Sequence, residues 1–176
     1  MELPIEDWSN AFRLINSIWT DPKFRTLQFK IINRIVGVAS YSSRVTGQSS
    51  DCTFCRLNNR MQRPESPEHA FYFCPTTYSL LQQLISWEPL KILEAKLDPF
   101  SILIWTKGTT PQHQFCINSI WIWTKAYLFS CIMKKTLPNI IGARRFITYQ
   151  AQDIDWTLKS HNKPPITVSF GSLKNT

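Results

Sequence analysis

Apolar residues recur at intervals of three and four along several long segments of the chain, which is the spacing of a helix with one buried face. The first such segment covers residues 5–19 and ends at Asp21-Pro22. A second helix is predicted from Lys23 to Ala39, with an apolar face formed by Phe24, Leu27, Ile31, Ile35 and Val38. The same spacing predicts helices from Pro75 to residue 87, over 112–136 and over 140–158. We therefore expect a mainly α fold.

Residues 40–68 interrupt this helical pattern. Ser, Thr, Gly, Asn and Pro cluster there and apolar residues are few, so the segment is ordered only if something ties it down. The pattern divides the chain into a helical region that carries this loop (1–87), a C-terminal helical region (88–159) and a tail (160–176). We expect the tail to be flexible, because it is polar and contains Pro164-Pro165.

The loop and the segment after it contain the pattern Cys52-x2-Cys55-x13-His69-x4-Cys74. Zinc takes four tetrahedral nitrogen or sulfur ligands, and two cysteines three positions apart can direct both sulfurs at one ion. Four protein ligands leave no place for a catalytic water, so the pattern predicts one structural Zn²⁺ and a zinc-knuckle-like CCHC loop inserted between helices.

The cysteine pattern is also compatible with chance and with redox chemistry. Three cysteines and one histidine can fall at these positions without a common ligand, and a Cys-x2-Cys pair can be a redox site. A redox pair requires a strand-to-helix setting that the flanking sequence SSDCTFCRLNN does not offer. We further expect the charge of Arg56 to favour thiolates, and Glu65 or Glu68 to accept the second ring N–H of His69.

The five cysteines bear on the compartment as well. Their number is odd and the acidic stretch from Met1 to Asp7 is no secretory signal, so we expect a nuclear and/or cytoplasmic protein that is not secreted. Cys116 and Cys131 lie on the apolar segment Phe115–Met133 and are expected in the core. Polar residues interrupt that segment before it reaches the roughly 18 apolar residues that span a bilayer, so no membrane partner is expected.

The charge of the chain is unevenly distributed. The net charge is +8 and the pI is about 9.4, yet the region from Lys23 to Arg63 contains eight basic residues and a single acid, Asp51. The basic residues are Lys23, Arg25, Lys30, Arg34, Arg44, Arg56, Arg60 and Arg63. Such a block is typical of a surface that binds RNA or DNA phosphates, and the alternative is a solvated face that keeps the protein soluble.

These residues also suggest a family. The segment Lys23–Trp87 resembles the zinc-binding region near the C-terminus of reverse transcriptases from LINE-type non-LTR retrotransposons. LQFKIINRI (Leu27–Ile35) resembles the basic-aromatic helix before the zinc site of that family. CTFC followed by PESPEHAFYFCP (Pro64–Pro75) resembles its C-x2-C … E-[ST]-x-x-H-x-F-x-x-C-P signature. By this resemblance Cys52, Cys55, His69 and Cys74 are zinc ligands, and Glu65, Phe71 and Pro75 occupy recurrent positions.

The resemblance extends more weakly to Asn118–Pro138, which is similar to the C-terminal helix of the same elements. The [FY]-x-D-D pair that holds the catalytic magnesium ions of a polymerase is missing, and so is an endonuclease constellation. The chain therefore resembles the C-terminal piece of such an element without its polymerase. The resemblance implies binding of template RNA or target DNA, and a reverse transcriptase or another retroelement protein as a partner.

Three functions remain open at this point. The leading hypothesis is a zinc-stabilised accessory module that binds nucleic acid, with Phe54 or an exposed Trp stacking on single-stranded RNA. The second is a protein-interaction module that docks through the apolar helix 112–136, and the third is a retroelement relic without function. An enzyme is not expected, because no nucleophile, base or metal-carboxylate set comes together in the sequence.

Overall fold

A computed structural model describes residues 21–39, 43, 47, 49–60, 63–105 and 110–160, with the side chains of residues 154–160 left out of the description. The helix predicted over 5–19, the predicted phosphate contact Arg44 and the tail beyond Ser160 lie outside these residues.

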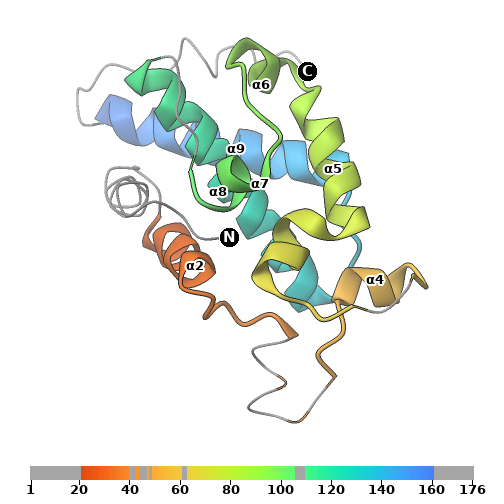
Figure 1. The fold of residues 1–176 in the computed structure, drawn as a ribbon. Coiled ribbons are helices and arrows are strands. Elements are labelled where there is room, and N and C mark those ends of the chain that lie inside the picture. Colours follow the sequence, from red (N-terminus) through yellow and green to blue (C-terminus); the bar gives the residue numbers. More distant parts are fainter. Residues whose placement is uncertain are drawn as a thin grey trace.

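The described part of the chain is mainly helical, as the apolar spacing predicted (Figure 1). The elements in order are α2 (Pro22–Ile32), α4 (Thr53–Leu57), the π-helix η1 (His69–Phe73), α5 (Pro75–Ile85), α6 (Glu88–Ile92), α7 (Pro99–Leu103), α8 (Pro111–Lys134) and α9 (Ile140–Ser160). Among the described residues, β pairing is limited to an isolated antiparallel bridge between Asp51 and Pro64.

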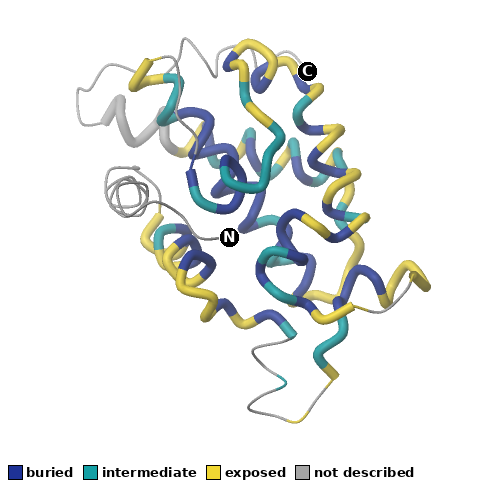
Figure 2. The backbone as a smooth tube through the Cα atoms, viewed as in Figure 1, coloured by how far each residue is buried: buried dark blue, intermediate teal, exposed yellow. Residues whose placement is uncertain are grey.

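Helix α8 forms the centre of the fold. It begins with Pro111 after the N-cap Thr110, whose side chain accepts from the backbone N–H of His113, and it ends at Lys135 in a left-handed conformation. Most of its residues from Cys116 to Ile132 are buried, because α8 packs against α2, α7, α9 and η1 (Figures 1 and 2). Trp121 and Trp123 lie in this core, and Cys116 and Cys131 are buried there as expected.

One hydrophobic core connects the two predicted helical regions. It contains Phe24 and Leu81 from the first region together with Trp121 and Ile147 from the second. The core therefore continues across residue 87, where the sequence pattern was divided into two helical regions. Segment 88–111, where the sequence predicted no regular element, contributes Leu90 from α6 and Ile102 from α7.

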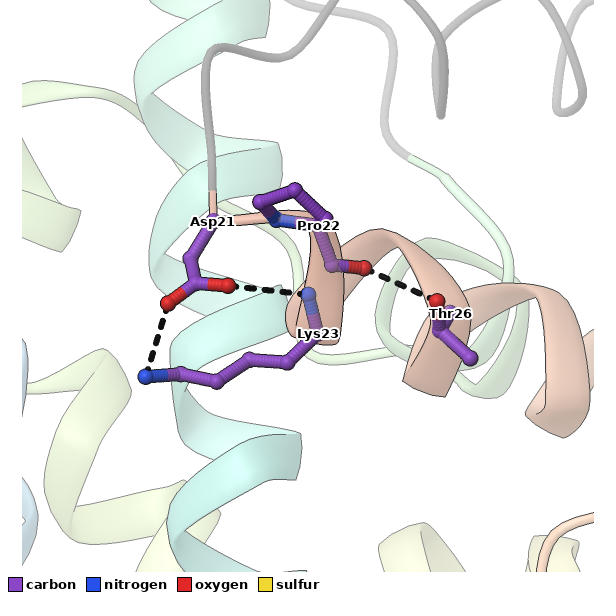
Figure 3. A network of polar contacts seen from close by, with 4 residues as sticks. All are labelled: Asp21, Pro22, Lys23 and Thr26. Carbon is purple, nitrogen blue, oxygen red and sulfur yellow. Dashed lines mark hydrogen bonds and ion pairs between the residues drawn. The ribbon is translucent and has the colours of Figure 1, made fainter.

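Helix α2 starts at a polar cap, which Figure 3 shows from close by. The Asp21 carboxylate accepts the backbone N–H of Lys23 at 2.9 Å and pairs with its ammonium group at 2.8 Å. The hydrogen bond from the Lys23 side chain lowers the pKa of Asp21 most, and the one from the Lys23 backbone lowers it further. The Thr26 hydroxyl donates to the Pro22 carbonyl one turn further on. The cap explains why the helix begins at Pro22.

Helix α2 ends at Ile32, so the predicted extension to Ala39 is wrong. Arg34 adopts a left-handed conformation (φ 56°), and the backbone N–H groups of Ile35 and Arg34 return to the carbonyls of Lys30 and Ile31. This is a Schellman motif, in which the left-handed residue stops the helix. Ile35 leaves the apolar face as a result and is 44% exposed. Buried Gln28 lies on that face instead and donates to the carbonyls of Leu103 and Ile104.

Candidate metal centre

Three segments bring the four predicted ligands together. Cys52 is the N-cap of α4, Cys55 lies within that helix, His69 begins η1, and Cys74 is the N-cap of α5. Their exposed fractions are 0%, 1%, 7% and 0%, in chain order. Their potential ligand atoms all lie within 4.8 Å of one another. The cluster is a closed, buried set of one nitrogen and three sulfurs that can hold one metal ion.

The distances within this cluster fit tetrahedral coordination. Cys74 Sγ lies 3.8 Å from both Cys52 Sγ and Cys55 Sγ, and Cys55 Sγ lies 3.4 Å from His69 Nε2. Zn–S bonds of about 2.3 Å and a Zn–N bond of about 2.0 Å would separate sulfurs by about 3.8 Å and sulfur from nitrogen by about 3.5 Å. A disulfide needs sulfurs about 2.05 Å apart, and all three cysteines are free.

The first two ligands sit on a short knuckle whose ends are tied to each other. The backbone N–H of Cys52 donates to the Arg63 carbonyl at 2.8 Å, and the N–H of Glu65 donates to the Ser50 carbonyl at 2.8 Å. These bonds frame the bridge between Asp51 and Pro64. Between them, α4 makes one turn that places Cys55 beside Cys52, as the Cys-x2-Cys spacing predicted.

A π-turn brings the other two ligands onto one side. Five residues of α-helix advance by about 500°, which would leave His69 and Cys74 about 140° apart around the helix axis. Instead, the backbone N–H of Cys74 donates to the His69 carbonyl at 2.7 Å, five residues back. This wider turn suits the four-residue gap between the two ligands. We did not predict the π-turn from the sequence, although the gap itself was its visible sign.

The site favours a thiolate at Cys74. Its pKa is lowered to about 3, first because the Cys52 thiol donates a hydrogen bond to its sulfur, and then through His69 and the amides of Thr77 and Thr76. Those two amides belong to the first turn of α5, where the helix dipole also favours negative charge. Donating that hydrogen bond raises the pKa of the Cys52 thiol, and burial raises that of Cys55. A thiolate is the form of cysteine that binds a metal.

The cation that acts on Cys55 differs from the expected one. Arg56 was predicted to favour thiolates, but its side chain is exposed, and the cation that acts on Cys55 is Arg60. Burial raises the pKa of Cys55, and the charge of Arg60 offsets only part of that rise. The contributions at Cys74 come from hydrogen bonds rather than from an arginine. Arg56 therefore remains available on the surface of the knuckle.

Glu65 supports the site through contacts that the sequence did not predict. Its fully buried carboxylate accepts the backbone N–H of Ala39 and the backbone N–H of Thr53, both at 2.8 Å. The expected bond to the ring of His69 is replaced by these two amides. The other candidate, Glu68, pairs with Arg34 at 2.8 Å. Glu65 thus ties the segment that follows α2 to the first turn of α4.

Replacing Glu65 with Ala is expected to lower the free energy of unfolding by about 2–4 kcal/mol, because two buried amide N–H groups lose their acceptor. Glu65→Gln keeps one carbonyl acceptor and should fall in between. Glu68→Ala is the matched control and should cost at most about 1 kcal/mol, because it removes a surface ion pair. Urea unfolding followed by tryptophan fluorescence measures all three, and equal losses at Glu65 and Glu68 would contradict this role.

The predicted phosphate contacts have different surroundings. Lys30, Arg56, Arg60 and Arg63 are exposed. Two others are also exposed but take part in ion pairs, namely Lys23 with Asp21 and Arg34 with Glu68. Arg25 is half-buried. Lys30, Arg56, Arg60 and Arg63 are therefore exposed and take part in no ion pair among the described residues, and the three arginines lie together on the knuckle.

The prediction that Phe54 stacks on RNA is wrong, because its ring is fully buried. Trp87, Trp105, Trp121 and Trp123 are buried as well, and the side chains of Trp8, Trp19 and Trp156 lie outside the described residues. Two aromatic residues that were not predicted to stack are exposed close to Cys74 in the sequence, Phe73 and Tyr78. Their closeness to the ligand Cys74 along the chain was the available signal.

One hypothesis was that the chain docks onto a protein partner through α8. Most apolar side chains of α8 are already buried within the fold. Docking through them would require the core to open. Across the described residues, no helix combines the length and the apolar character needed to cross a membrane.

The family resemblance stays a prediction of the sequence. No protein-family model, curated protein or solved structure matches this chain.

Proposed function

We propose that this chain is a zinc-stabilised nucleic-acid-binding module. The observation that carries the proposal is the buried set of Cys52, Cys55, His69 and Cys74 inside a knuckle whose outer surface is basic. Three sulfurs and one imidazole nitrogen in a tetrahedral arrangement favour Zn²⁺ over the hard cations Mg²⁺ and Ca²⁺. Because the four ligands close the coordination shell, the ion has a structural role and is not catalytic.

The basic surface supports the choice of partner. Arg56, Arg60 and Arg63 are exposed, and no ion pair involves them within the described residues. Zinc would hold the short segment that carries them in one shape, so that three guanidinium groups meet a phosphate backbone together. Such contacts give affinity with little sequence specificity and depend strongly on salt concentration.

The sequence resemblance supports a biological setting for this activity. It associates the knuckle with the C-terminal region of a retrotransposon reverse transcriptase, which would bind template RNA or target DNA. We propose that the chain contributes binding in this way and leaves DNA synthesis to a separate polymerase.

Charge reversal tests the proposal. The triple variant Arg56→Glu, Arg60→Glu, Arg63→Glu should bind a 20-nucleotide RNA at least about 10-fold more weakly, and the slope of log K against log salt should fall by about 2. Fluorescence anisotropy at several salt concentrations measures both quantities. The matched control reverses Lys134, Lys135 and Arg145, which are also exposed but lie on α8, its C-cap and α9. Equal loss in both triple variants, or no loss in the first, would contradict the proposal.

A further inference from the structure

Three aromatic rings form a cluster beside the metal site. The ring of Tyr72 makes edge-to-face contacts with Phe73, at a centroid distance of 5.0 Å, and with Tyr78, at 5.7 Å. Tyr72 is buried, whereas Phe73 is 54% exposed and Tyr78 is 37% exposed. Two partly exposed rings are thus in contact with one buried ring.

These rings are held in place by their surroundings. Phe73 is the last residue of η1 and directly precedes the ligand Cys74, while Tyr78 lies in the first turns of α5. The Tyr72 hydroxyl donates to the Leu97 carbonyl at 3.4 Å, and the backbone N–H of Tyr78 donates to the Cys74 carbonyl at 2.8 Å. The rings therefore lose little conformational freedom when a ligand covers them.

Exposure of a large apolar ring is unfavourable in water, so a ligand that covers the exposed half of Phe73 gains affinity. Phe71 and Tyr72 of the same turn are buried, whereas Phe73 lies on its solvent-exposed side. A flat ligand that covers the ring would gain this affinity.

We infer that Phe73 and Tyr78 form a platform on which unpaired bases of a single-stranded nucleic acid stack. The inference rests on the proposed function and specifies its ligand. Positive charge favours a nucleic acid over an apolar peptide as the ligand, because the knuckle beside these rings exposes Arg56, Arg60 and Arg63. The bases of a duplex are stacked on one another and hide their faces, so only an unpaired strand can use the rings.

The arrangement allows the rings and the arginines to act on one strand. The Asn58 side chain donates to the Thr76 hydroxyl at 2.7 Å, which joins the end of α4 to the first turn of α5. The arginine-bearing knuckle and the ring-bearing helix are thereby fixed to each other. Asp98 carries a negative charge close enough to act electrostatically on Tyr72, and its carboxylate accepts the amide and the hydroxyl of Ser101 as the cap of α7. We therefore expect the phosphates to contact the arginines rather than the surroundings of Tyr72.

The test compares a single-stranded RNA with a duplex of the same sequence. Phe73→Ala and Tyr78→Ala should each weaken binding of the single strand about 10-fold and leave binding of the duplex within about 2-fold, since one stacked base is lost. Phe73→Trp should retain the affinity and Phe73→Leu should lose it, because leucine covers apolar surface but has no aromatic face. The salt slope should stay unchanged in all four variants, unlike in the arginine variant.

Tyr149→Ala is the matched control, because Tyr149 is 67% exposed and belongs to α9, which carries none of the predicted ligands or knuckle arginines. Each variant is checked for metal content and melting temperature, and Phe73→Leu decides the question if Phe73→Ala is unstable. Wild-type protein that binds neither the single-stranded RNA nor the duplex would overturn the proposed function and the platform together. Wild-type protein that binds RNA while Phe73→Leu and Tyr78→Ala bind it equally well would overturn the platform alone. Equal losses for the duplex, or in Tyr149→Ala, would also overturn the platform.

Discussion

Cys55→Ser is expected to abolish metal binding and to unfold the knuckle. Zinc sites of this kind contribute on the order of 10 kcal/mol of apparent binding free energy, and that energy is gained only in the folded state. The backbone hydrogen bonds at the ends of the knuckle and the two amides held by Glu65 contribute only about 1 kcal/mol each, which is far less than the ion. Without the ion, three buried sulfur atoms and one imidazole lose their common partner.

Circular dichroism and thermal unfolding measure this effect, and a strong chelator added to the wild-type protein should reproduce it. Cys116→Ala is the matched control, because Cys116 is equally buried but lies on α8 outside the cluster. It should keep the metal and lose only about 1 kcal/mol of stability. A Cys55→Ser variant as stable as Cys116→Ala, or a wild-type melting temperature that ignores the chelator, would rule out a structural metal.

Lys125→Met is expected to stabilise the protein by about 2–4 kcal/mol at pH 7. Lys125 is buried in the middle of α8, and its ammonium group reaches the Leu103 carbonyl at 3.4 Å. Desolvation by burial lowers its pKa to about 7. An apolar side chain of similar length would occupy the same space without the cost of burying a charge.

The same residue predicts how stability depends on pH. The unfolded chain keeps Lys125 protonated up to its ordinary pKa of about 10.4, whereas the folded chain releases that proton near pH 7. The unfolded state therefore binds more protons between these values, and the free energy of unfolding should rise as the pH rises through this window. Below pH 7 both states are protonated and the destabilisation is complete.

Urea unfolding between pH 6 and 10 tests this second expectation. Lys125→Met should remove most of the pH-dependent rise, while Lys134→Met, which changes an exposed lysine of the same helix, should leave it in place. A wild-type stability that is flat or falling across this range would contradict a depressed pKa at Lys125.

The parts of the fold that the sequence predicted well are those with local signals at both ends. Helix α8 was expected over 112–136 and runs from Pro111 to Lys134, because Thr110-Pro111 caps its start and Pro138 limits its end. The end of α2 was misplaced because a left-handed Arg34 stops it, and arginine carries no signal for that conformation. The short helices α6 and α7 were missed because five residues are too few to show a helical period.

At the candidate site, too, the features with local sequence signals were predicted and those set by tertiary packing were missed. The four potential ligands were found because cysteine and histidine spacing reflects local turn geometry, and the structure brings all four together. The burial of Phe54 and the exposure of Phe73 were missed because tertiary packing decides which side of a short turn is covered. The role of Glu65 depends on Ala39, which lies 26 positions away, and no local pattern shows such a partner.

Metal content of the freshly purified, reduced protein, measured by native and elemental mass spectrometry, tests the zinc site most directly. We predict one zinc ion per chain in the wild-type protein and in Cys116→Ala, and none in Cys55→Ser. A wild-type chain without metal, or a Cys55→Ser variant that keeps its zinc, would contradict a zinc site formed by Cys52, Cys55, His69 and Cys74.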